Sequence, residues 1–178
     1  ITPRNINEVT VVFTDMDENE SDYQYTTIAI TPSVKATYAN DILNSKNTDF
    51  NVSYENNVAV STVSSKAVVI LTGNDGNYTG EKRVEFNIVP RDLSTLTVNE
   101  IADQFYTGTA IKPAVTIFNN NTLLTTDDYT AVYADNTNPG TALITIVANK
   151  DGNYKGSTTA TFIITNKPID PSLLPEIV

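Results

Sequence analysis

The sequence predicts an all-β chain made of two tandem β-sandwich domains. Three observations lead to this prediction: apolar and polar residues alternate along several short runs, Asp-Gly and Asn-rich turns separate those runs, and one series of motifs occurs twice in the same order. Alternation with a period of two is the pattern of a strand with one buried face, and Asp-Gly between two such runs is a strong hairpin signal. No window places apolar residues at helical spacing.

The chain contains one unit twice. Five stretches match in order: Tyr25–Thr26 with Tyr106–Thr107, Ile30–Val34 with Ile111–Val115, Asp49–Tyr54 with Asp128–Tyr133, Asp75–Gly80 with Asp151–Gly156, and Phe86–Ile88 with Phe162–Ile164. The offset between the copies falls from 87 at Arg4 and Arg91 to 81, then 79, then 76. The first copy is therefore expected to carry three insertions, of 6, 2 and 3 residues, in loops that tolerate extra length.

The junction between the copies is repeated as well. Val89-Pro90-Arg91-Asp92-Leu93 resembles Thr2-Pro3-Arg4-Asn5-Ile6 at the start of the chain. We therefore place the first repeat at residues 1–90, with residues 1–3 ending a preceding repeat, and the second repeat at 91–166. Residues 167–178 contain three prolines and are expected to form a tail or linker. The parent protein is then expected to be an array of more than two units.

Alternation and turn residues define the expected strands and core. In the second copy the strands are expected at Leu93–Val98, around Tyr106, and at Ala114–Phe118, Leu123–Leu124, Tyr129–Ala134, Thr141–Ala148 and Thr158–Ile164. About seven short strands per repeat match a sandwich of the immunoglobulin type. The core of the second copy is expected to contain Tyr133, Ile144, Ile146, Tyr154, Phe162 and Ile164, and that of the first Tyr54, Val68, Ile70, Tyr78, Phe86 and Ile88.

Composition excludes several classes of function. The chain has 11 Lys and Arg against 21 Asp and Glu, and this net charge of −10 repels nucleic-acid phosphates, so no nucleic-acid partner is expected. It has no His and no Cys, which rules out Ser-His-Asp and Cys-His catalysis, disulfides and thiolate zinc sites. No apolar run approaches the roughly 20 residues of a membrane helix, so no membrane insertion is expected. We expect no enzyme activity and no cofactor.

The motif residues of the two copies resemble a known family. They are Tyr106, Gly108, Pro113, Tyr129, Tyr133, Gly152, Tyr154, Gly156 and Phe162 in the second copy, and Tyr54, Gly76, Tyr78, Gly80 and Phe86 in the first. With this Tyr-x-Gly motif the chain resembles the MBG-like tandem immunoglobulin-like repeats of bacterial cell-surface proteins and adhesins. The first copy departs from the pattern, with Thr27 at the place of Gly108, Ser64 at that of Gly140, and the insertion Val12–Gln24.

The resemblance implies a role as well as a fold. It implies an extracellular segment, on the bacterial cell surface or secreted, that serves as a non-enzymatic stalk or adhesive part and is monomeric within a larger array. Two alternatives remain. In the first alternative, the first repeat with its insertion is a binding module for a host protein or glycan. In the second alternative, both repeats are accessory domains of a secreted enzyme.

An acidic run in the insertion is a candidate calcium site. Carboxylate and amide oxygens of Asp15, Asp17, Asn19 and Asp22 could face a Ca²⁺ ion, which takes six to eight oxygen ligands. The EF-hand pattern is not met, because Glu20 stands where the sharp turn needs Gly. A solvated loop without metal is the favoured interpretation.

Two further groups could carry chemistry. Asp127 and Asp128 are adjacent, which does not suit the paired carboxylates of glycoside cleavage. A Lys–Asn isopeptide crosslink, known in some surface repeats, needs a buried lysine, an asparagine and a nearby acid. Lys66, Lys82 and Lys150 lie in polar or turn-flanking positions, so we expect all three to be solvated.

The tyrosines could form a platform for carbohydrate. Most of them recur in both copies, which favours packing in the core or at corners. Tyr23 and Tyr38 occur only in the first copy and are the expected exposed candidates for sugar stacking.

Overall fold

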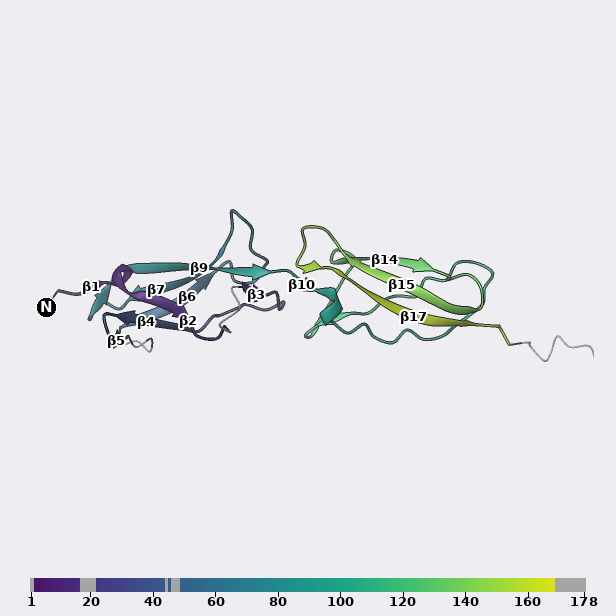
Figure 1. Cartoon of the computed structure of the whole chain (residues 1–178), viewed down its shortest axis with the longest axis horizontal. Helices are drawn as coiled ribbons and strands as arrows, with labels where there is room; N and C mark the ends of the chain where they lie inside the picture. The colour runs from purple at the N-terminus through teal and green to yellow at the C-terminus, as the bar shows by residue number, and fades with distance from the viewer. Residues whose placement is uncertain (1, 17–21, 44, 46–48, 169–178) are drawn as a thin grey trace, which may run out of the picture. The chain divides into compact units, whose positions relative to one another are not determined.

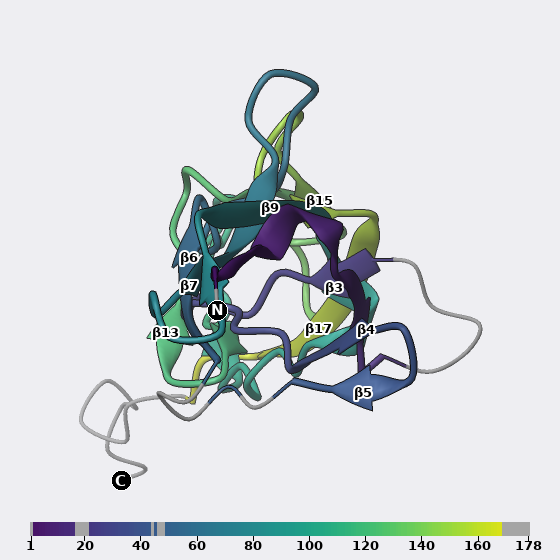
Figure 2. The same cartoon turned by 90° about the vertical axis from the view of Figure 1, so that its left-hand side faces the viewer.

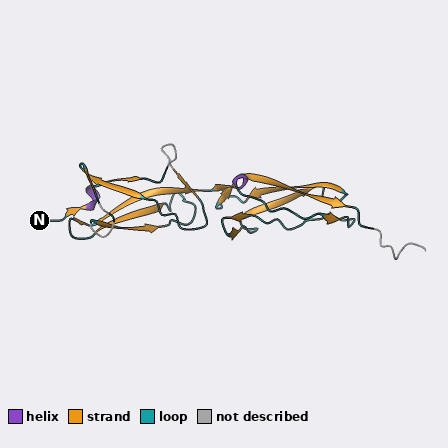
Figure 3. Ribbon diagram, turned by 90° about the horizontal axis from the view of Figure 1, so that it is seen from below, coloured by secondary structure: helices purple, strands orange, loops and turns teal. Residues whose placement is uncertain are grey.

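The computed structural model describes residues 2–16, 22–43, 45 and 49–168. Strands make up most of the secondary structure, and the helices among the described residues are two single 3-10 turns, η1 (Ile6–Glu8) and η2 (Leu93–Thr95) (Figure 3). The chain divides into two compact units, Ile1–Arg91 and Asp92–Val178. The chain is therefore all-β, as predicted.

The first unit has two main sheets. The larger has the order β3 (Asp22–Gln24), β9 (Glu81–Val89), β7 (Ala67–Gly73), β6 (Phe50–Glu55), with β3 parallel to β9 and the other pairs antiparallel. The smaller is antiparallel, with the order β2 (Thr10–Phe13), β4 (Val34–Tyr38), β5 (Asp41–Ile42). Figure 2 shows β4 and β5 on the opposite side of the unit from β6 and β7. A short parallel pair, β1 (Arg4–Asn5) with β8 (Tyr78–Thr79), completes the unit.

The second unit repeats this arrangement. Its larger sheet has the order β11 (Gln104–Phe105), β17 (Ser157–Thr165), β15 (Gly140–Ala148), β14 (Tyr129–Ala134), again with one parallel pair, β11 with β17. Figure 1 shows β14, β15 and β17 of this sheet side by side. The hairpin of β12 (Phe118–Asn119) and β13 (Thr122–Leu123) corresponds in sequence to the β4–β5 hairpin of the first unit. The short pair is β10 (Arg91–Asp92) with β16 (Tyr154–Lys155).

Both sheets of the first unit contribute to its core. One cluster joins Ala36 of β4 to Val69 and Leu71 of β7, with Ile6 and Phe50 packed against them, all of them buried. Fully burying a side chain of this size stabilises the fold by about 1.5–3 kcal/mol. Apolar contact between two facing sheets is the arrangement of a β-sandwich.

The core of the second unit follows the predicted alternation. Ala142, Ile144 and Ile146 are each 0% exposed, and Phe162 and Ile164 are each 2% exposed. Thr159 and Thr161, which precede Phe162 on β17 and alternate with Ala160, are exposed. Tyr133 is half-buried, with its hydroxyl bonded to the backbone of the same unit.

Val68 and Ile70, both predicted in the core of the first unit, are buried, at 8% and 5% exposed, but they lie outside its inner clusters. Both side chains lie on the face of β7 opposite to Phe86, because Ala67 is the residue that pairs with Phe86. Their strand partners include Glu55 beside Val68 and Arg83 beside Ile70, and the ion pair between Glu55 and Arg83 crosses this outer face. The inward residues of β7 are Ala67, Val69 and Leu71.

The expectation that these two residues face inward arose from a one-residue difference between the two hairpins. The backbone N–H of Gly73 donates to the carbonyl of Gly80 in the first unit, as that of Ala148 donates to Gly156 in the second. The difference in residue number between equivalent positions of the two copies is therefore 75 before the turn and 76 after it. Lys150 is the extra residue in the second copy. The last insertion of the first copy before β7 therefore has 4 residues, where the sequence analysis expected 3. A shift of one residue in the alignment exchanges the two faces of a strand.

Two expected strands of the second copy are largely irregular. Leu93–Val98 begins with the 3-10 turn η2, because the Asp92 side chain accepts a hydrogen bond from the backbone N–H of Ser94 at 2.9 Å and caps that turn. Within Ala114–Phe118, the described pairing is a single bridge between Ile117 and Val98, followed by β12. Pro113 before this run cannot donate to a ladder, which weakens strand pairing there.

Candidate functional site

In each unit, a tyrosine on the equivalent strand donates a hydrogen bond to the backbone carbonyl of a proline that both copies share. The Tyr54 hydroxyl donates to the carbonyl of Pro32 at 2.7 Å, and the Tyr133 hydroxyl donates to the carbonyl of Pro113 at 2.6 Å. Burial raises the pKa of both tyrosines. These phenols are therefore neutral donors at physiological pH, and their hydroxyls are used inside the fold.

An asparagine three residues after each tyrosine makes a second shared clasp. Asn57 donates its side-chain amide to the carbonyl of Ile30 at 2.8 Å, and Asn136 does the same to Ile111 at 2.8 Å. The backbone N–H of each isoleucine donates back to the carbonyl of the same asparagine. The sequence analysis did not identify Asn57, although the repeated Tyr-x-x-Asn spacing was a signal for it.

Gly80 and Gly156 lie next to the side chains that cap the two 3-10 turns. Both have left-handed backbone, with φ of 83° and 73°. A Cβ at Gly156 would stand 2.7 Å from Oδ1 of Asp92, and one at Gly80 would stand 3.3 Å from Oδ1 of Asn5. Asn5 caps η1 as Asp92 caps η2, so these glycines leave space for a capping side chain.

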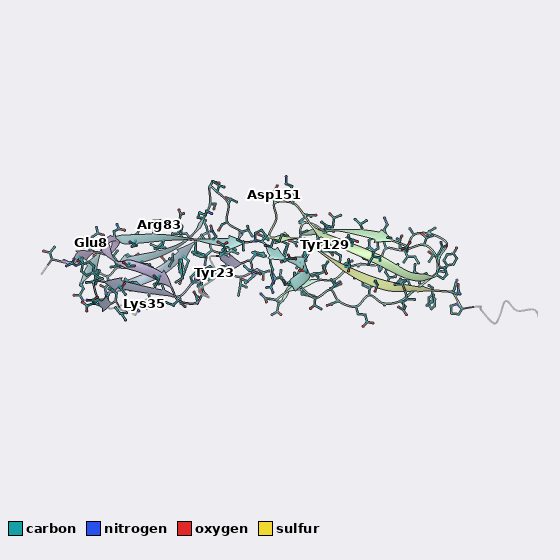
Figure 4. The ribbon with its side chains drawn as sticks, viewed as in Figure 1. Glu8, Tyr23, Lys35, Arg83, Tyr129 and Asp151 are labelled. Atoms are coloured by element: carbon teal, nitrogen blue, oxygen red, sulfur yellow. The ribbon has the colours of Figure 1, made fainter. Side chains whose placement is uncertain are left out.

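The repeated Asp-Gly-Asn-Tyr motif builds a hairpin tip. In each copy the residue with left-handed backbone is the aspartate, with φ of 63° at Asp75 and 61° at Asp151, the latter labelled in Figure 4. Tyr154 is 5% exposed, and its hydroxyl accepts a hydrogen bond from the side chain of Asn119, which is fully buried. The motif thus forms a turn and anchors it to the opposite hairpin.

The Tyr-x-Gly motif also defines a turn. Gly108 has φ of 79°, and Thr27 at the equivalent place has φ of 72°, so the turn keeps its shape without the glycine. Tyr106 is 40% exposed, and its backbone N–H donates to the carbonyl of Thr165. This tyrosine is attached through its backbone and leaves part of its ring to solvent.

The two described residues of the calcium candidate are engaged in protein hydrogen bonds. Asp15 accepts from the Tyr23 hydroxyl at 2.7 Å and from the backbone N–H of Ser33 at 2.9 Å. Asp22 accepts from the side chain of Asn87 at 2.9 Å. Asp17 and Asn19 lie outside the described residues. Among the described residues, no group of three or more acidic side chains could hold a metal ion.

The exposed tyrosines expected for sugar stacking are both half-buried, which corrects that prediction. Tyr23, labelled in Figure 4, makes edge-to-face contacts with Phe13 and Phe86 at centroid distances of 6.2 Å and 5.4 Å. Burial, together with the hydrogen bond to Asp15, raises its pKa. Tyr38 is covered by the guanidinium of Arg4, 4.0 Å from its ring centroid, so one ring face is occupied.

The acid pair and the lysines also have structural partners. Asp128 accepts from the backbone N–H of Thr125 at 2.8 Å and closes a turn. Lys82 donates to the carbonyl of Asn7 at 2.9 Å, and Lys150 is exposed. Lys66 differs from the expectation: it is half-buried, and its ammonium donates to the side-chain oxygen of Asn87 at 2.6 Å.

The second unit carries an apolar groove that the sequence analysis did not identify. It has a volume of about 660 Å³ and is lined by Pro113, Val115, Leu123, Leu124, Tyr129 and Tyr133, among others. The hydroxyls of Tyr129 and Tyr133 donate to the carbonyls of Val115 and Pro113. These two donors are therefore already used within the unit, and what the two tyrosines offer to the groove is their rings.

Comparison with known proteins does not place the chain in a family. No protein-family model, curated protein or solved structure matches it. The resemblance to MBG-like repeats therefore stays a prediction. Among the described residues, no helix is long and apolar enough to span a membrane.

Proposed function

We propose that the chain is a non-enzymatic structural segment, a stalk or spacer, of an extracellular bacterial surface protein or adhesin. In this proposal it comprises two tandem immunoglobulin-like β-sandwich domains of about seven strands each. The observation that supports it best is that polar residues common to both copies make the same internal hydrogen bonds in both. A residue used to hold a turn or a corner is not free to bind a substrate.

Three duplicated contacts carry this argument. They are the tyrosine-to-proline-carbonyl bond, the asparagine clasp on an isoleucine, and the capped 3-10 turn under a left-handed glycine, each with nearly the same distances in both units. The net charge of −10 suits a solvated segment that resists non-specific association.

Binding arrays test this proposal directly. The whole chain, immobilised through its C-terminal tail, should show no saturable binding to panels of host glycans and extracellular-matrix proteins. When it is stretched as a single molecule, it should unfold in two separate steps, one for each repeat. Saturable binding in the arrays, or one undivided unfolding step, would count against a spacer of two domains.

The second candidate is a binding module, and the groove on the second unit supports it. Apolar grooves with few oriented polar groups are typical sites for ligands. If an array does show binding, Leu123→Asp in the groove should abolish it, while Val63→Asp should not. Val63 is a suitable control because it is 99% exposed in the first unit and is not among the residues that line the groove.

A further inference from the structure

A lysine, an asparagine and an aspartate lie side by side on neighbouring strands of the first unit. Asn87 of β9 pairs directly with Asp22 of β3. Lys66 immediately precedes Ala67 of β7, whose partner in β9 is Phe86, so Lys66 lies on the other side of Asn87. The Lys66 ammonium donates to Oδ1 of Asn87 at 2.6 Å, and Nδ2 of Asn87 donates to Oδ1 of Asp22 at 2.9 Å. Both contacts are half-buried.

This geometry places the lysine nitrogen close to the carboxamide carbon. A carbonyl C=O bond is about 1.23 Å long, so Nζ of Lys66 lies at most about 3.8 Å from Cγ of Asn87. Reacting atoms in a near-attack arrangement are about 3–3.5 Å apart. A small rotation of either side chain would bring the two atoms to that distance.

We propose that Lys66 and Asn87 become joined by an intramolecular isopeptide bond, with Asp22 as the acid–base group. A proton first passes from the ammonium of Lys66 to the carboxylate of Asp22 through the carboxamide of Asn87, which is hydrogen-bonded to both groups. The neutral amine then attacks Cγ of Asn87, a new C–N bond forms to Nζ, and the bond from Cγ to Nδ2 breaks. Asp22 gives its proton to the departing Nδ2 and takes one from Nζ, so that ammonia leaves and carries the last proton away as ammonium. No oxidant, reductant or cofactor takes part.

The position of Asp22 suits this role. Its oxygen contacts Nδ2, which is the leaving nitrogen, and the 2.9 Å distance is a hydrogen bond along which a proton can pass. Tyr23, the next residue on β3, packs against Phe13 and Phe86 and is bonded to Asp15. These contacts hold β3 against β9 and therefore fix Asp22 beside Asn87.

The surroundings favour reaction over free rotation in solvent. Lys66 and Asn87 line a cleft together with Phe13, Phe86 and Glu85. Asp22 and Asn87 are held by the pairing of β3 with β9, and Lys66 directly precedes β7, so much of the entropy loss of bringing the three groups together has already occurred on folding.

The second unit lacks this group of residues and is a natural comparison. At the places of Lys66 and Asn87 it has Thr141 and Ile163, which pair directly across β15 and β17. Asp103 occupies the place of Asp22, next to Gln104, whose partner is Ile164. Only the acid is retained, so no crosslink can form there. The inference concerns the chemistry of the first unit and does not depend on the proposed function.

Intact mass and a tryptic map of the whole folded chain test this proposal. We expect a mass lower than that of the sequence by one ammonia, and a branched peptide that joins the segment around Lys66 to the segment Val84–Arg91. The branched peptide is the decisive signal, because a succinimide at any asparagine also loses ammonia but joins no second peptide. Lys66→Arg, Asn87→Ala and Asp22→Asn should each restore the full mass and remove the branched peptide.

Two matched variants serve as controls. Lys82→Arg changes a lysine that bonds to a backbone carbonyl. Glu85→Gln changes a carboxylate that lines the cleft but makes neither of the two hydrogen bonds to Asn87. Both should keep the branched peptide. A folded wild-type chain of full mass without that peptide would overturn the proposal, and a branched peptide that persists in Asp22→Asn would overturn the role of Asp22.

Discussion

The two units share their internal contacts and differ in what surrounds them. Each has the same strand order in its larger sheet, the same tyrosine and asparagine clasps and the same capped turn. The first unit adds an insertion with the aromatic group of Phe13, Tyr23 and Phe86. The second adds Lys150 to a hairpin and carries an apolar groove.

This difference shows where function can be sought. Contacts present in both units are accounted for by folding, because each satisfies a buried backbone group or allows a turn. The features not accounted for in this way are the groove of the second unit and the group of lysine, asparagine and aspartate of the first, of which the second unit retains only the acid, Asp103. Those are the places where the chain has chemistry that its fold does not require.

The largest expected effect comes from the aromatic residue on the last long strand of each unit. Phe162→Ala should destabilise the second unit by about 3–5 kcal/mol, because its side chain is 2% exposed. Phe86→Ala should destabilise the first unit by at least as much, since it also loses edge-to-face contacts with Phe13 and Tyr23 that are each worth about 0.5–1.5 kcal/mol. Hydrogen exchange read by mass spectrometry reports each unit separately. Unchanged protection in β15 or β7 would contradict the core assignment.

Substitution of the two glycines that lie next to the capping side chains should destabilise the two units by unequal amounts. Gly156→Ala puts a Cβ 2.7 Å from the Asp92 carboxylate and should destabilise the second unit by about 2–3 kcal/mol, from left-handed strain plus a displaced cap. Gly80→Ala meets Asn5 at 3.3 Å, and we expect only the strain, about 1–2 kcal/mol. Denaturant unfolding with the same local exchange readout measures both. Equal losses would show that the cap contact does not differ between the units.

A smaller effect, of opposite sign in the two units, is expected at the Tyr-x-Gly turn. Thr27 is β-branched and has φ of 72°, a strained combination, so Thr27→Gly should stabilise the first unit by about 1 kcal/mol. Gly108→Thr should destabilise the second unit by a similar amount. The changes in unfolding midpoint of the two variants measure this. If Thr27→Gly is destabilising, the turn of the first unit has a different shape.

The smallest expected effect is a difference in acid stability. Hydrogen bonds from Ser94, with help from Lys155, lower the pKa of Asp92 below its ordinary value of 3.8. A lowered pKa means that the ionised cap stabilises the fold above the ordinary value and that this stabilisation is lost as the pH falls toward the folded pKa. Asn5, its counterpart, does not titrate. Asp92→Asn should therefore flatten the acid dependence of exchange around η2 relative to the wild type, and an unchanged profile would refute a titrating cap.

The sequence predicted strands well where alternation was clear and failed where register decided the outcome. Tyr129–Ala134 is the strand β14 with the predicted bounds, because its alternation continues from end to end. Val68 and Ile70 were assigned to the wrong face because the extra residue Lys150 hid a shift of one position between the copies.

The candidate sites were harder to predict. Tyr23 lies in an insertion without a counterpart, so no internal comparison could show that Phe13 and Phe86 cover it. Lys66 and Asn87 are 21 positions apart in sequence, and only the pairing of β7 with β9 brings them together. Contacts of this kind depend on strand register, which composition and periodicity do not contain.

The central claim is that residues shared by the two units hold the same internal contacts. The most direct measurement is the hydroxyl proton exchange of Tyr54 and Tyr133 by NMR, with contacts to residues 32 and 113. We predict slowly exchanging hydroxyl protons for both tyrosines, each close to its own proline-containing segment. Fast exchange of either hydroxyl with water, and no contact to that segment, would contradict the account.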